Sequence, residues 1–404
     1  MQLLKSKKIV WVIVSLFAAG LFVFFFYQHG LFSNTNATSE VTPELLGKEN
    51  REDYFPEKAT IKYAKGFTLT YHKNYKVLNI INPFNQGRDT IKYVLVQRGT
   101  KAPTDIKNAF TIEIPIRSLA CLSTSHLALT EMLGVDSMVI GFSDSNYIFN
   151  PKFKSRIKEG KVLQVGSDET LNNEGVIALK PDLLMIIGWS ATKMNSYKTL
   201  MESGIGVVVN SEWMETSPLS RTEWVKMLAA FLNKEGEAEK KFNEVEKKYL
   251  VVKVLTQNRK INSKVINGMS YKGAWYIPGG RSFLAALLND AKADSYWSKD
   301  SSTGSLPFNF EAVYEKALNA DFWLDPGNAR SLKEITAMDP RYGSLKPYKN
   351  GGVFNNNKRS NAAGANDYFE SGVVNPDLIL SDLIEIFHPD LFPNRELVYY
   401  QQLK

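Results

Sequence analysis

Residues 275–297, WYIPGGRSFLAALLNDAKADSYW, place two glycines and an arginine directly before an apolar helical pattern. Glycine-rich turns before helices can hold phosphate groups, because the free N–H groups at a helix start attract anions. A nucleotide-binding P-loop, however, has four residues between its glycines and then Gly-Lys-Ser/Thr. Here Gly279 and Gly280 are adjacent, no such lysine follows, and no Gly-x-Gly-x-x-Gly pattern occurs elsewhere. Nucleotide binding is therefore not predicted, and the role of Arg281 depends on the elements around it.

Hydrolytic chemistry is the second possibility that the residue types raise. Ser123 and His126 stand three residues apart and Ser301 is another candidate nucleophile, but no acidic residue is identified that would orient the histidine. No Gly-x-Ser-x-Gly or His-Glu-x-x-His run occurs. The Ser-Thr-Ser run at 123–125 more plainly predicts a helix cap. Catalysis is therefore not expected, and a membrane-anchored hydrolase is kept as a distant alternative.

The histidines and the cysteine do not suggest a metal site. His29, His72, His126 and His388 are the four histidines, and they are spread over the chain. Sites for bare zinc or manganese combine several histidines with carboxylates, so no resident metal or other cofactor is predicted. The single cysteine, Cys121, lies in an apolar run and is predicted to be a core residue without a disulfide partner.

The bulk composition indicates a globular chain with two domains. It has 404 residues, of which 44% are hydrophobic and 23% are charged, so it can form two substantial cores. The formal net charge of +7 is modest for this length, and no basic block indicates a nucleic-acid partner.

An uncharged segment near the N-terminus predicts a membrane anchor. Residues 9–27, IVWVIVSLFAAGLFVFFFY, are long enough to cross a bilayer as one helix. The lysines before them place residues 1–8 in the cytoplasm as a short tail. A small-x-small cleavage site occurs only at 35–37, some distance downstream. We expect an uncleaved single-pass anchor, followed by a polar tether over 28–58 on the outer side.

The patterns after the tether predict an α/β lobe. Alternating apolar and polar residues over 67–82 and 89–99 predict an added β-hairpin. From Ile112 the pattern changes to strand, helix, strand, and residues 174–188 repeat the helix-to-strand step. Such alternation predicts a parallel sheet covered on both faces, in an N-terminal lobe over 59–220 that includes the hairpin.

A charged, helix-periodic segment at about 234–256 follows this lobe. A helix of that length would extend on the order of 35 Å, enough to pass from one lobe into another. Residues 221–258 are interpreted as helices that include this connection, and a C-terminal α/β lobe is expected over 259–404. The halves are weakly self-similar, because 174–188 and 311–327 each begin with glutamate and end as an apolar strand before glycine.

This order of elements resembles the substrate-binding proteins of ABC importers, specifically the helical-backbone class that carries ferric siderophores, haem or cobalamin. The resemblance covers about residues 112–404. Its most specific parts are the strand at 117–123 with TSHLALTEMLGV after it, the interlobe helix, and the phrases LNNEGVIALKPDLLMI and LPFNFEAVYEKALNADFWL. The closing ESGVVNPDLILSDLIEIFHPDLFPNRELVYY and the added hairpin are similar to the iron-siderophore branch of Bacteroidetes-type bacteria. The implied fold is two Rossmann-like lobes joined by a long helix.

The resemblance implies a ligand cleft between the lobes, at the carboxyl ends of the strands, where open α/β sheets generally bind ligands. Residues 275–285 would form the second lobe's first strand-to-helix turn, with Gly279 and Gly280 allowing a sharp bend. Arg281 and the N–H groups at the helix start would face an anionic cargo. Aromatic faces and arginines suit a large planar chelate. The candidate ligand-binding residues are Tyr147, Trp189, Trp213, Tyr271, Trp275, Tyr276, Arg281, Arg359 and Tyr368.

Two glutamates match positions with a docking role in the family. Glu174 and Glu311 stand where the family keeps one surface glutamate on each lobe, to meet arginines of the membrane permease. Because single exposed ion pairs are weak, the recognition would come from two carboxylates held apart on a rigid body. Each glutamate could equally favour the N-terminal end of its own helix through the dipole.

The resemblance implies a monomeric protein on the periplasmic face of the inner membrane, or free in the periplasm if the N-terminal segment is cleaved. It would capture a ferric siderophore and deliver it to a permease driven by an ATPase subunit. Haem needs one axial Tyr or His, which His126, Tyr147 or Tyr271 could supply. Cobalamin would be held mainly by aromatic residues, so the basic candidates favour an anionic ferric chelate. Haem and cobalamin are the alternative cargoes.

Overall fold

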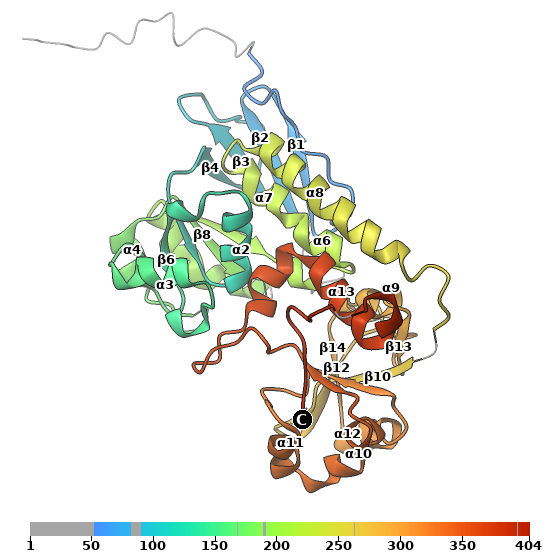
Figure 1. Ribbon diagram of the computed structural model, residues 1–404. Coiled ribbons are helices and arrows are strands. Elements are labelled where there is room, and N and C mark those ends of the chain that lie inside the picture. Colours follow the sequence, from blue (N-terminus) through green and yellow to red (C-terminus); the bar gives the residue numbers. More distant parts are fainter. Residues whose placement is uncertain (1–51, 82–89, 168, 189–190, 262, 394) are drawn as a thin grey trace, which may run out of the picture. The chain divides into compact units, whose positions relative to one another are not determined.

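The protein is described by a computed structural model (Figure 1), which covers residues 52–81, 90–167, 169–188, 191–261, 263–393 and 395–404. The membrane anchor predicted at 9–27 and most of the predicted tether lie outside these residues. Within the described part of the chain, no helix combines the length and apolar character needed to cross a bilayer.

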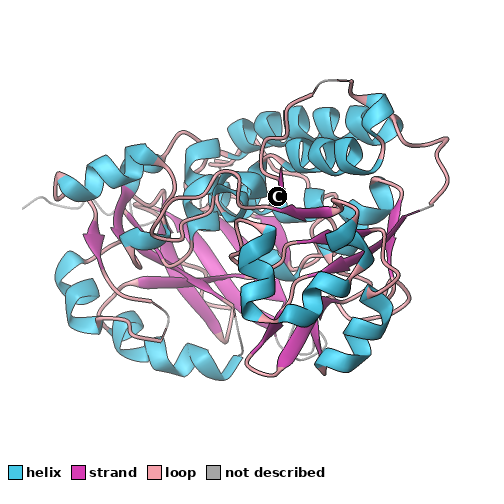
Figure 2. Cartoon of the chain, turned by 60° about the horizontal axis from the view of Figure 1, so that its bottom comes forward, coloured by secondary structure: helices cyan, strands magenta, loops and turns pink. Residues whose placement is uncertain are grey.

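The first lobe is built on a five-stranded sheet in the order β7-β6-β5-β8-β9, and every neighbouring pair is parallel. The central strands are apolar and buried, as expected for a parallel sheet between helices (Figure 2). The predicted alternation of strands and helices is confirmed. The strands are β5 (Leu119–Cys121), β6 (Val139–Phe142), β7 (Leu163–Gln164), β8 (Leu183–Ile187) and β9 (Gly206–Asn210). The helices are α2 (Thr124–Met132), α3 (Pro151–Lys158), α4 (Asn173–Leu179) and α5 (Lys198–Glu202).

The second lobe repeats this plan with the sheet order β13-β10-β15-β16-β17, in which β17 alone pairs antiparallel. Its core contains Trp275, Trp323 and Tyr342, whose rings contact one another. The strands are β10 (Ser263–Asn267), β13 (Ala293–Ser295), β15 (Phe322–Leu324), β16 (Val353–Asn355) and β17 (Gln401–Gln402). The helices are α9 (Phe283–Asp290), α10 (Phe310–Ala317), α11 (Leu332–Met338) and α12 (Lys346–Lys349).

A small antiparallel sheet is inserted in the second lobe. Its position shows that the expected role of residues 275–285 was wrong. The lobe's first strand is β10, and a hairpin of β11 (Ser270–Tyr271) and β12 (Ala274–Pro278) lies between β10 and α9. The third strand, β14 (Ser305–Phe308), pairs with β12. Residues 275–285 are therefore not the lobe's first strand-to-helix turn. Because side chains alternate along a strand, β12 buries Trp275 and exposes Tyr276.

The added hairpin is part of a larger sheet. Strands β2 (Tyr75–Ile81) and β3 (Thr90–Gln97) pair antiparallel, as the hairpin prediction required. The segment 67–82 is not one strand, because the chain reverses after β1 (Phe67–Tyr71) and pairs back with β2. In addition, β4 (Ala109–Ile114) joins β3 in parallel, so the strand expected to open the α/β lobe near Ile112 completes this four-stranded sheet instead.

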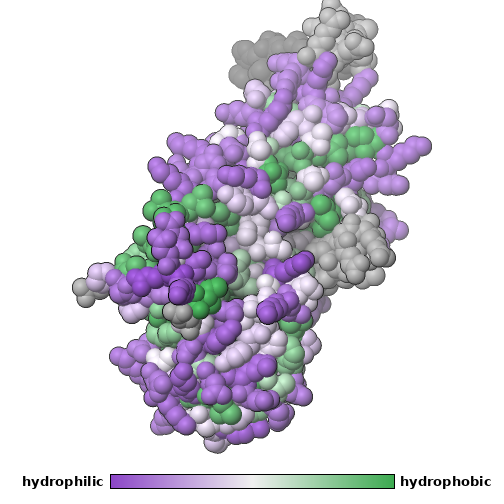
Figure 3. Space-filling view, turned by 90° about the vertical axis from the view of Figure 1, so that its right-hand side faces the viewer, coloured by the Kyte–Doolittle hydropathy of each residue, from purple (hydrophilic) through white to green (hydrophobic). Residues whose placement is uncertain are grey.

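A group of helices connects the lobes. The predicted interlobe helix is confirmed as α8 (Glu235–Val254), whose 20 residues extend about 30 Å. It packs against α7 (Trp224–Ala230) and α13 (Pro376–Phe387), and α6 (Pro218–Thr222) contacts α9. Its outer surface exposes several aliphatic residues towards its C-terminal end, and Figure 3 shows that apolar patches on this side of the molecule are broken up by hydrophilic side chains.

The chain that leads into β1 runs along α8. The Glu57 carboxylate packs against Gly236, the Thr60 N–H donates to Glu239 Oε2 (3.3 Å), and Lys62 pairs with Glu246. These contacts follow α8 from its first turn to its middle. The N-terminal sheet and the interlobe helix are therefore one packed unit.

Candidate functional site

The carboxyl ends of the parallel strands form the region where both lobes contribute to cavities. Open α/β sheets bind ligands at this edge, because the loops that leave the strands carry side chains not needed for the sheet. Two cavities have walls from both halves of the chain, one at these strand ends and one along α9 and the edge strand β13. We name them the amide cavity, of about 370 Å³, and the cationic cavity, of about 500 Å³.

The amide cavity lies where the loops after β5 and β6 face the loops after β15 and β16. The first lobe contributes Thr124 and Tyr147, and the second lobe contributes mainly small polar residues. The second-lobe wall consists of Asn328, Arg330, Asn357, Ser360, Asn361, Ala362, Ala363, Gly364, Asn366 and Phe369. The wall is therefore dominated by neutral hydrogen-bonding groups.

Hydrogen bonds within the second lobe hold this wall in place. Arg330 donates from Nη2 to Ser360 Oγ (2.9 Å) and to the Asn361 carbonyl (3.1 Å). Asn357 donates to the Ala329 carbonyl (3.0 Å) and accepts from Gln401 Nε2 (2.7 Å). Arg330 thus serves as a support for the loop rather than as a free charge.

Asp325 stands at the carboxyl end of β15, just before this wall, and sequence reasoning missed it. Its backbone has φ 56°, in the left-handed region that a non-glycine residue rarely adopts. Its Oδ2 accepts from Asn267 Nδ2 (3.3 Å), whereas Oδ1 is buried without a hydrogen-bond partner among the described residues. Burial raises the pKa of Asp325 to about 7. The available signal was an acid directly after the apolar run Phe322–Leu324.

The loop after the amide cavity is bound to the first lobe by another buried acid. Glu370 accepts hydrogen bonds from the N–H groups of Phe149 (2.8 Å) and Asn150 (3.0 Å). Burial is the main cause that raises the pKa of Glu370 to about 7, and the charges of Asp367 and Glu131 act in the same direction. Thr124 adds a bond from its hydroxyl to the Phe369 carbonyl (3.3 Å).

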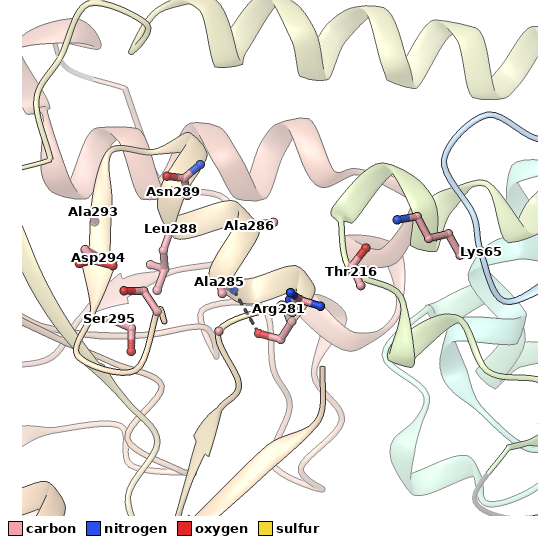
Figure 4. A pocket seen from close by; sticks show the side chains of 13 residues that line it. Lys65, Thr216, Arg281, Ala285, Ala286, Leu288, Asn289, Ala293, Asp294 and Ser295 are labelled. Carbon is pink, nitrogen blue, oxygen red and sulfur yellow. Dashed lines mark hydrogen bonds between the residues drawn. The ribbon is translucent and has the colours of Figure 1, made fainter. Parts of the chain in front are cut away.

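The cationic cavity is lined by α9, β13 and the loop after β9 (Figure 4). Arg281 and Lys65 are its basic residues, and Asp294 is its acid. Lys264 donates to Asp294 Oδ2 (2.6 Å). Burial alone would raise the pKa of Asp294, but the hydrogen bonds to its carboxylate, that of Lys264 first, outweigh burial and lower the pKa. The rest of the wall is Thr216, Gly280, Ser282, Ala285, Ala286, Leu288, Asn289, Ala293, Ser295 and Ser298.

The turn before α9 differs from the expectation in two respects. A Cβ on Gly279 would lie 2.3 Å from the Ser302 carbonyl oxygen, so this glycine permits a close approach of two backbones rather than a special bend. The N–H groups around the turn are also used internally. Arg281 N donates to Ser302 O (3.0 Å), and Ala285 N donates to Ser282 Oγ (3.2 Å). The Arg281 side chain therefore contributes to the cavity, whereas these N–H groups do not face it.

The predicted aromatic residues are not gathered at one place. Tyr147 lines the amide cavity and is 60% exposed. Tyr271 and Tyr276 are exposed on the small antiparallel sheet and line neither named cavity, and Trp213 lies partly buried after β9. Trp189 lies outside the described residues.

Two of the predicted ligand-binding aromatics lie in the core instead. Trp275 is fully buried and donates from Nε1 to the Asn267 carbonyl (2.8 Å). Tyr368 is 5% exposed and packs edge-on against Tyr399 and Tyr400. Neither side chain is placed to stack on a cargo, because each fills a packed interior.

Arg359 lies outside both named cavities. It pairs with the buried Asp367 at 2.7 Å and lies over the rings of Phe149 and Tyr399. It lines a third cavity of about 420 Å³ between α2, α8 and α13. The structure thus separates the two predicted arginines, and only Arg281 reaches the cationic cavity.

Glu174 and Glu311 occupy matching positions in the two lobes. Each is the second residue of its helix, after an asparagine cap: Asn172 accepts from Gly175 N, and Asn309 accepts from Ala312 N. Each helix precedes a central strand, β8 or β15. Both glutamates are exposed, and Glu311 has Arg341 at 3.6 Å.

The residues weighed for other chemistry have structural surroundings. His126 is buried in α2, and desolvation lowers its pKa to about 3. Ser123 caps the same helix by accepting from Ser125 N (3.3 Å). Cys121 is buried in β5. Among the described residues, no group of three His, Cys, Asp or Glu side chains is placed to hold a metal ion.

Comparison with known proteins adds to this geometry. Residues 119–359 match the family model described as Periplasmic binding protein. A relative in Methanocaldococcus jannaschii, named as an uncharacterized lipoprotein, is 31% identical over 365 residues. The aligned region covers 84% of this chain and 84% of the relative.

Two solved structures are similar at the level of the fold. One is described as a possible iron-binding (periplasmic solute-binding) protein of Staphylococcus epidermidis, with TM-score 0.51 and 18% identity, covering 68% of this chain and 99% of that one. The other is the periplasmic heme-binding protein RhuT of Roseiflexus in apo form, with TM-score 0.50 and 13% identity, covering 68% and 99%.

Proposed function

Because the chain belongs to the periplasmic binding protein family, we propose that it captures a ferric siderophore outside the cytoplasm and delivers it to an ABC importer. Binding proteins of this family work with a membrane permease and its ATPase. The predicted anchor at 9–27 would hold the protein near that permease and raise its local concentration there. The narrower resemblance, to the iron-siderophore branch of Bacteroidetes-type bacteria, is part of the proposal.

The observation that supports an anionic cargo most directly is the state of Arg281. Its side chain lines a cavity with walls from both halves of the chain, and no carboxylate among the described residues pairs with it. A guanidinium group offers a fork of donors to carboxylate or catecholate oxygens. Ferric catecholates and many ferric carboxylates carry net negative charge, so they would neutralise this arginine.

The proposed action requires binding and release but no covalent step. Cargo between the lobes would favour a small closure, and the two-lobe contacts of α8 and α13 would limit its extent. Tyr249 on α8 already donates to Asp290 of α9 (2.8 Å), so the helix is fixed to the second lobe as well as to the first.

Glu174 and Glu311 would then dock the loaded protein onto cationic residues of the permease. Their identical positions, one per lobe and both exposed, support this role. Reversal of both to lysine should leave cargo affinity unchanged and abolish uptake in cells. Uptake at the wild-type rate would exclude the docking role.

The amide cavity favours cobalamin as a second candidate cargo. Its asparagine side chains and loop N–H groups suit a neutral ligand with many amide groups better than a trianion. Haem is the third candidate, since Tyr147 is exposed in the same cavity and could serve as an axial ligand.

Tryptophan-fluorescence titration of the full chain in detergent tests the proposal. The ligands are a ferric tris-catecholate, a neutral ferric tris-hydroxamate, cobalamin and haemin. Saturable quenching by a ferric siderophore supports the proposed cargo. Saturation by cobalamin or haemin alone keeps the transport role and replaces the cargo, and a lack of binding to all four contradicts the proposal.

A further inference from the structure

The N-terminal addition contributes a side chain to the cationic cavity. Lys65 precedes β1 and lies outside the residues that match the family model, which begin at Leu119. Lys65 nevertheless lines the same cavity as Arg281 of the second lobe. In Figure 4 the two side chains extend towards the same space, with the Thr216 side chain between them.

Two buried carboxylates fix the backbone that carries Lys65. Glu223 accepts from the N–H groups of Lys62 (2.9 Å), Tyr63 (2.6 Å) and Ala64 (2.7 Å). Glu215 accepts from the N–H groups of Lys65 (3.0 Å) and Gly66 (2.8 Å). Five consecutive N–H groups are thus bound by two side chains, one in the loop after β9 and one between the connecting helices α6 and α7. These hydrogen bonds fix the backbone of residues 62–66, and with it the position from which the Lys65 side chain extends.

Glycine at position 66 allows this close contact. A Cβ there would lie 2.6 Å from Trp224 Cζ2 and 3.0 Å from Glu215 Oε1. The indole N–H of Trp224 also donates to Glu215 Oε1 (2.9 Å), so the carboxylate, the ring and the backbone form one packed contact. Thr216 follows Glu215 directly and presents its own side chain to the cavity. The elements that hold Lys65 therefore also form part of the cavity wall.

The cavity has two basic groups that lack a described acidic partner. No ion pair joins Lys65 or Arg281 to a carboxylate among the described residues, whereas Lys264 already pairs with Asp294, the acid in the wall. The nearby Glu215 is occupied by three N–H donors. Both side chains are exposed at the cavity, so an anion between them would contact two positive charges from different lobes.

We propose that Lys65 and Arg281 together form an anion-binding subsite for a carboxylate or catecholate group. This deepens the proposed function and rests on it, since the anion would be part of the captured chelate. Lys65 would act as a specificity-determining residue, because it adds a second charge-assisted contact that a neutral cargo cannot use. It would also link the lobes through the ligand, because an anion between the two cations would make an attractive contact with each.

The first experiment compares charged and neutral probes on the full chain in detergent. Lys65→Met should weaken binding of a ferric tris-catecholate about tenfold and leave a neutral ferric tris-hydroxamate unchanged. Lys65→Arg should keep most of the affinity, because the charge is retained. Lys73→Met is the matched control, since Lys73 is exposed in the turn between β1 and β2 and lines neither named cavity.

The second experiment uses iron-free citrate as a probe, so that failure of the subsite can be distinguished from failure of the proposed function. By calorimetry, citrate should bind the wild type and Lys73→Met, and more weakly Lys65→Met and Arg281→Met. If no chelate binds but citrate behaves in this way, the siderophore proposal fails and the subsite stands. If the chelate binds and Lys65→Met matches the wild type for both probes, the subsite is wrong. Thermal unfolding of each variant identifies any loss of folding, and Lys65→Arg then provides the decisive comparison.

Discussion

The amide cavity and the cationic cavity differ in how the polar side chains of their walls are bonded. In the amide cavity, Arg330 and Asn357 are already bonded to neighbouring loops, so the wall is held in shape before any ligand arrives, and Arg330 keeps its positive charge while it supports the loop. In the cationic cavity, Arg281 and Lys65 have no described acidic partner. A satisfied wall selects by shape and by individual hydrogen bonds, whereas unpaired charges select by net charge. The two cavities therefore differ in the property of a ligand that each would select.

The largest expected effect comes from removing a support of the cationic cavity. Glu223→Ala would leave the N–H groups of Lys62, Tyr63 and Ala64 without this acceptor and would remove one of the two carboxylate partners of the buried Lys226, which keeps Glu239 at 3.0 Å. Losing one member of a buried ion pair typically costs about 3–5 kcal/mol of unfolding free energy. Denaturant unfolding measures the cost, with the exposed Glu244→Ala as control. A change below about 1 kcal/mol would show that the N-terminal segment does not depend on this carboxylate.

The Arg281→Met variant, with a lysine variant as its control, gives the next largest effect. Arg281→Met should weaken a ferric tris-catecholate about 30-fold, or about 2 kcal/mol, because a charge-assisted contact is lost. Binding of the neutral tris-hydroxamate should stay within about twofold. Lys333→Met, at an exposed site of the same lobe, controls for net charge. An equal loss for both ligands would remove the distinction between the cavities.

Arg330→Met should have a smaller and less selective effect. The side chain supports the 360–361 loop, so its loss should relax the amide cavity and weaken charged and neutral cargoes alike, about fivefold. The same titrations measure this. A selective loss of the anionic ligand would instead mean that Arg330 acts as a charge, against its observed bonding.

The smallest expected effect concerns the pH dependence of Asp325. An unfolded Asp titrates near pH 4, and burial raises the folded-state pKa to about 7. The folded state therefore holds this proton more tightly, so the stability contributed by the group falls as pH rises from about 4 to about 7.

Asp325→Asn removes that dependence. Its melting temperature relative to the wild type should be about 2–4 °C higher at pH 8 than at pH 4.5. Glu370 has a pKa raised in the same direction and is left intact, so the difference between the two proteins isolates Asp325. Parallel pH profiles would show that Asp325 is ionised in the folded protein, and the end of the cleft beside the amide cavity would then not be neutral.

Much of the architecture follows from local patterns. The charged helical period over 234–256 predicted α8. The matched glutamates predicted equivalent positions in the two lobes, and the structure shows that each follows an asparagine cap, Asn172 or Asn309, at the start of its helix. These features depend on spacing within one segment, which the sequence shows directly.

The candidate site was less predictable, because it is formed by residues that are far apart in the sequence and come together only in the folded chain. Tyr276 and Trp275 are neighbours of similar character, yet the strand register exposes one and buries the other. Lys65 and Arg281 lie more than 200 positions apart, and nothing in either local pattern indicates that they line one cavity. The adjacent glycines Gly279 and Gly280 were evident in the sequence. The reason for them, close contact with the backbone of residues 298–304, could be seen only in the tertiary structure.

The segment that runs along α8 also determines how a pull on the N-terminus would be distributed. Tension applied at Glu52 would pass through the contacts of Glu57, Thr60 and Lys62 with α8, and then into β1. These contacts are arranged in series along the helix and would be loaded in shear, whereas none of them involves the second lobe. If the predicted anchor holds the N-terminus, the load would therefore enter the molecule through α8 and the N-terminal sheet, and would reach the second lobe only through α8 and its contacts such as Tyr249 with Asp290.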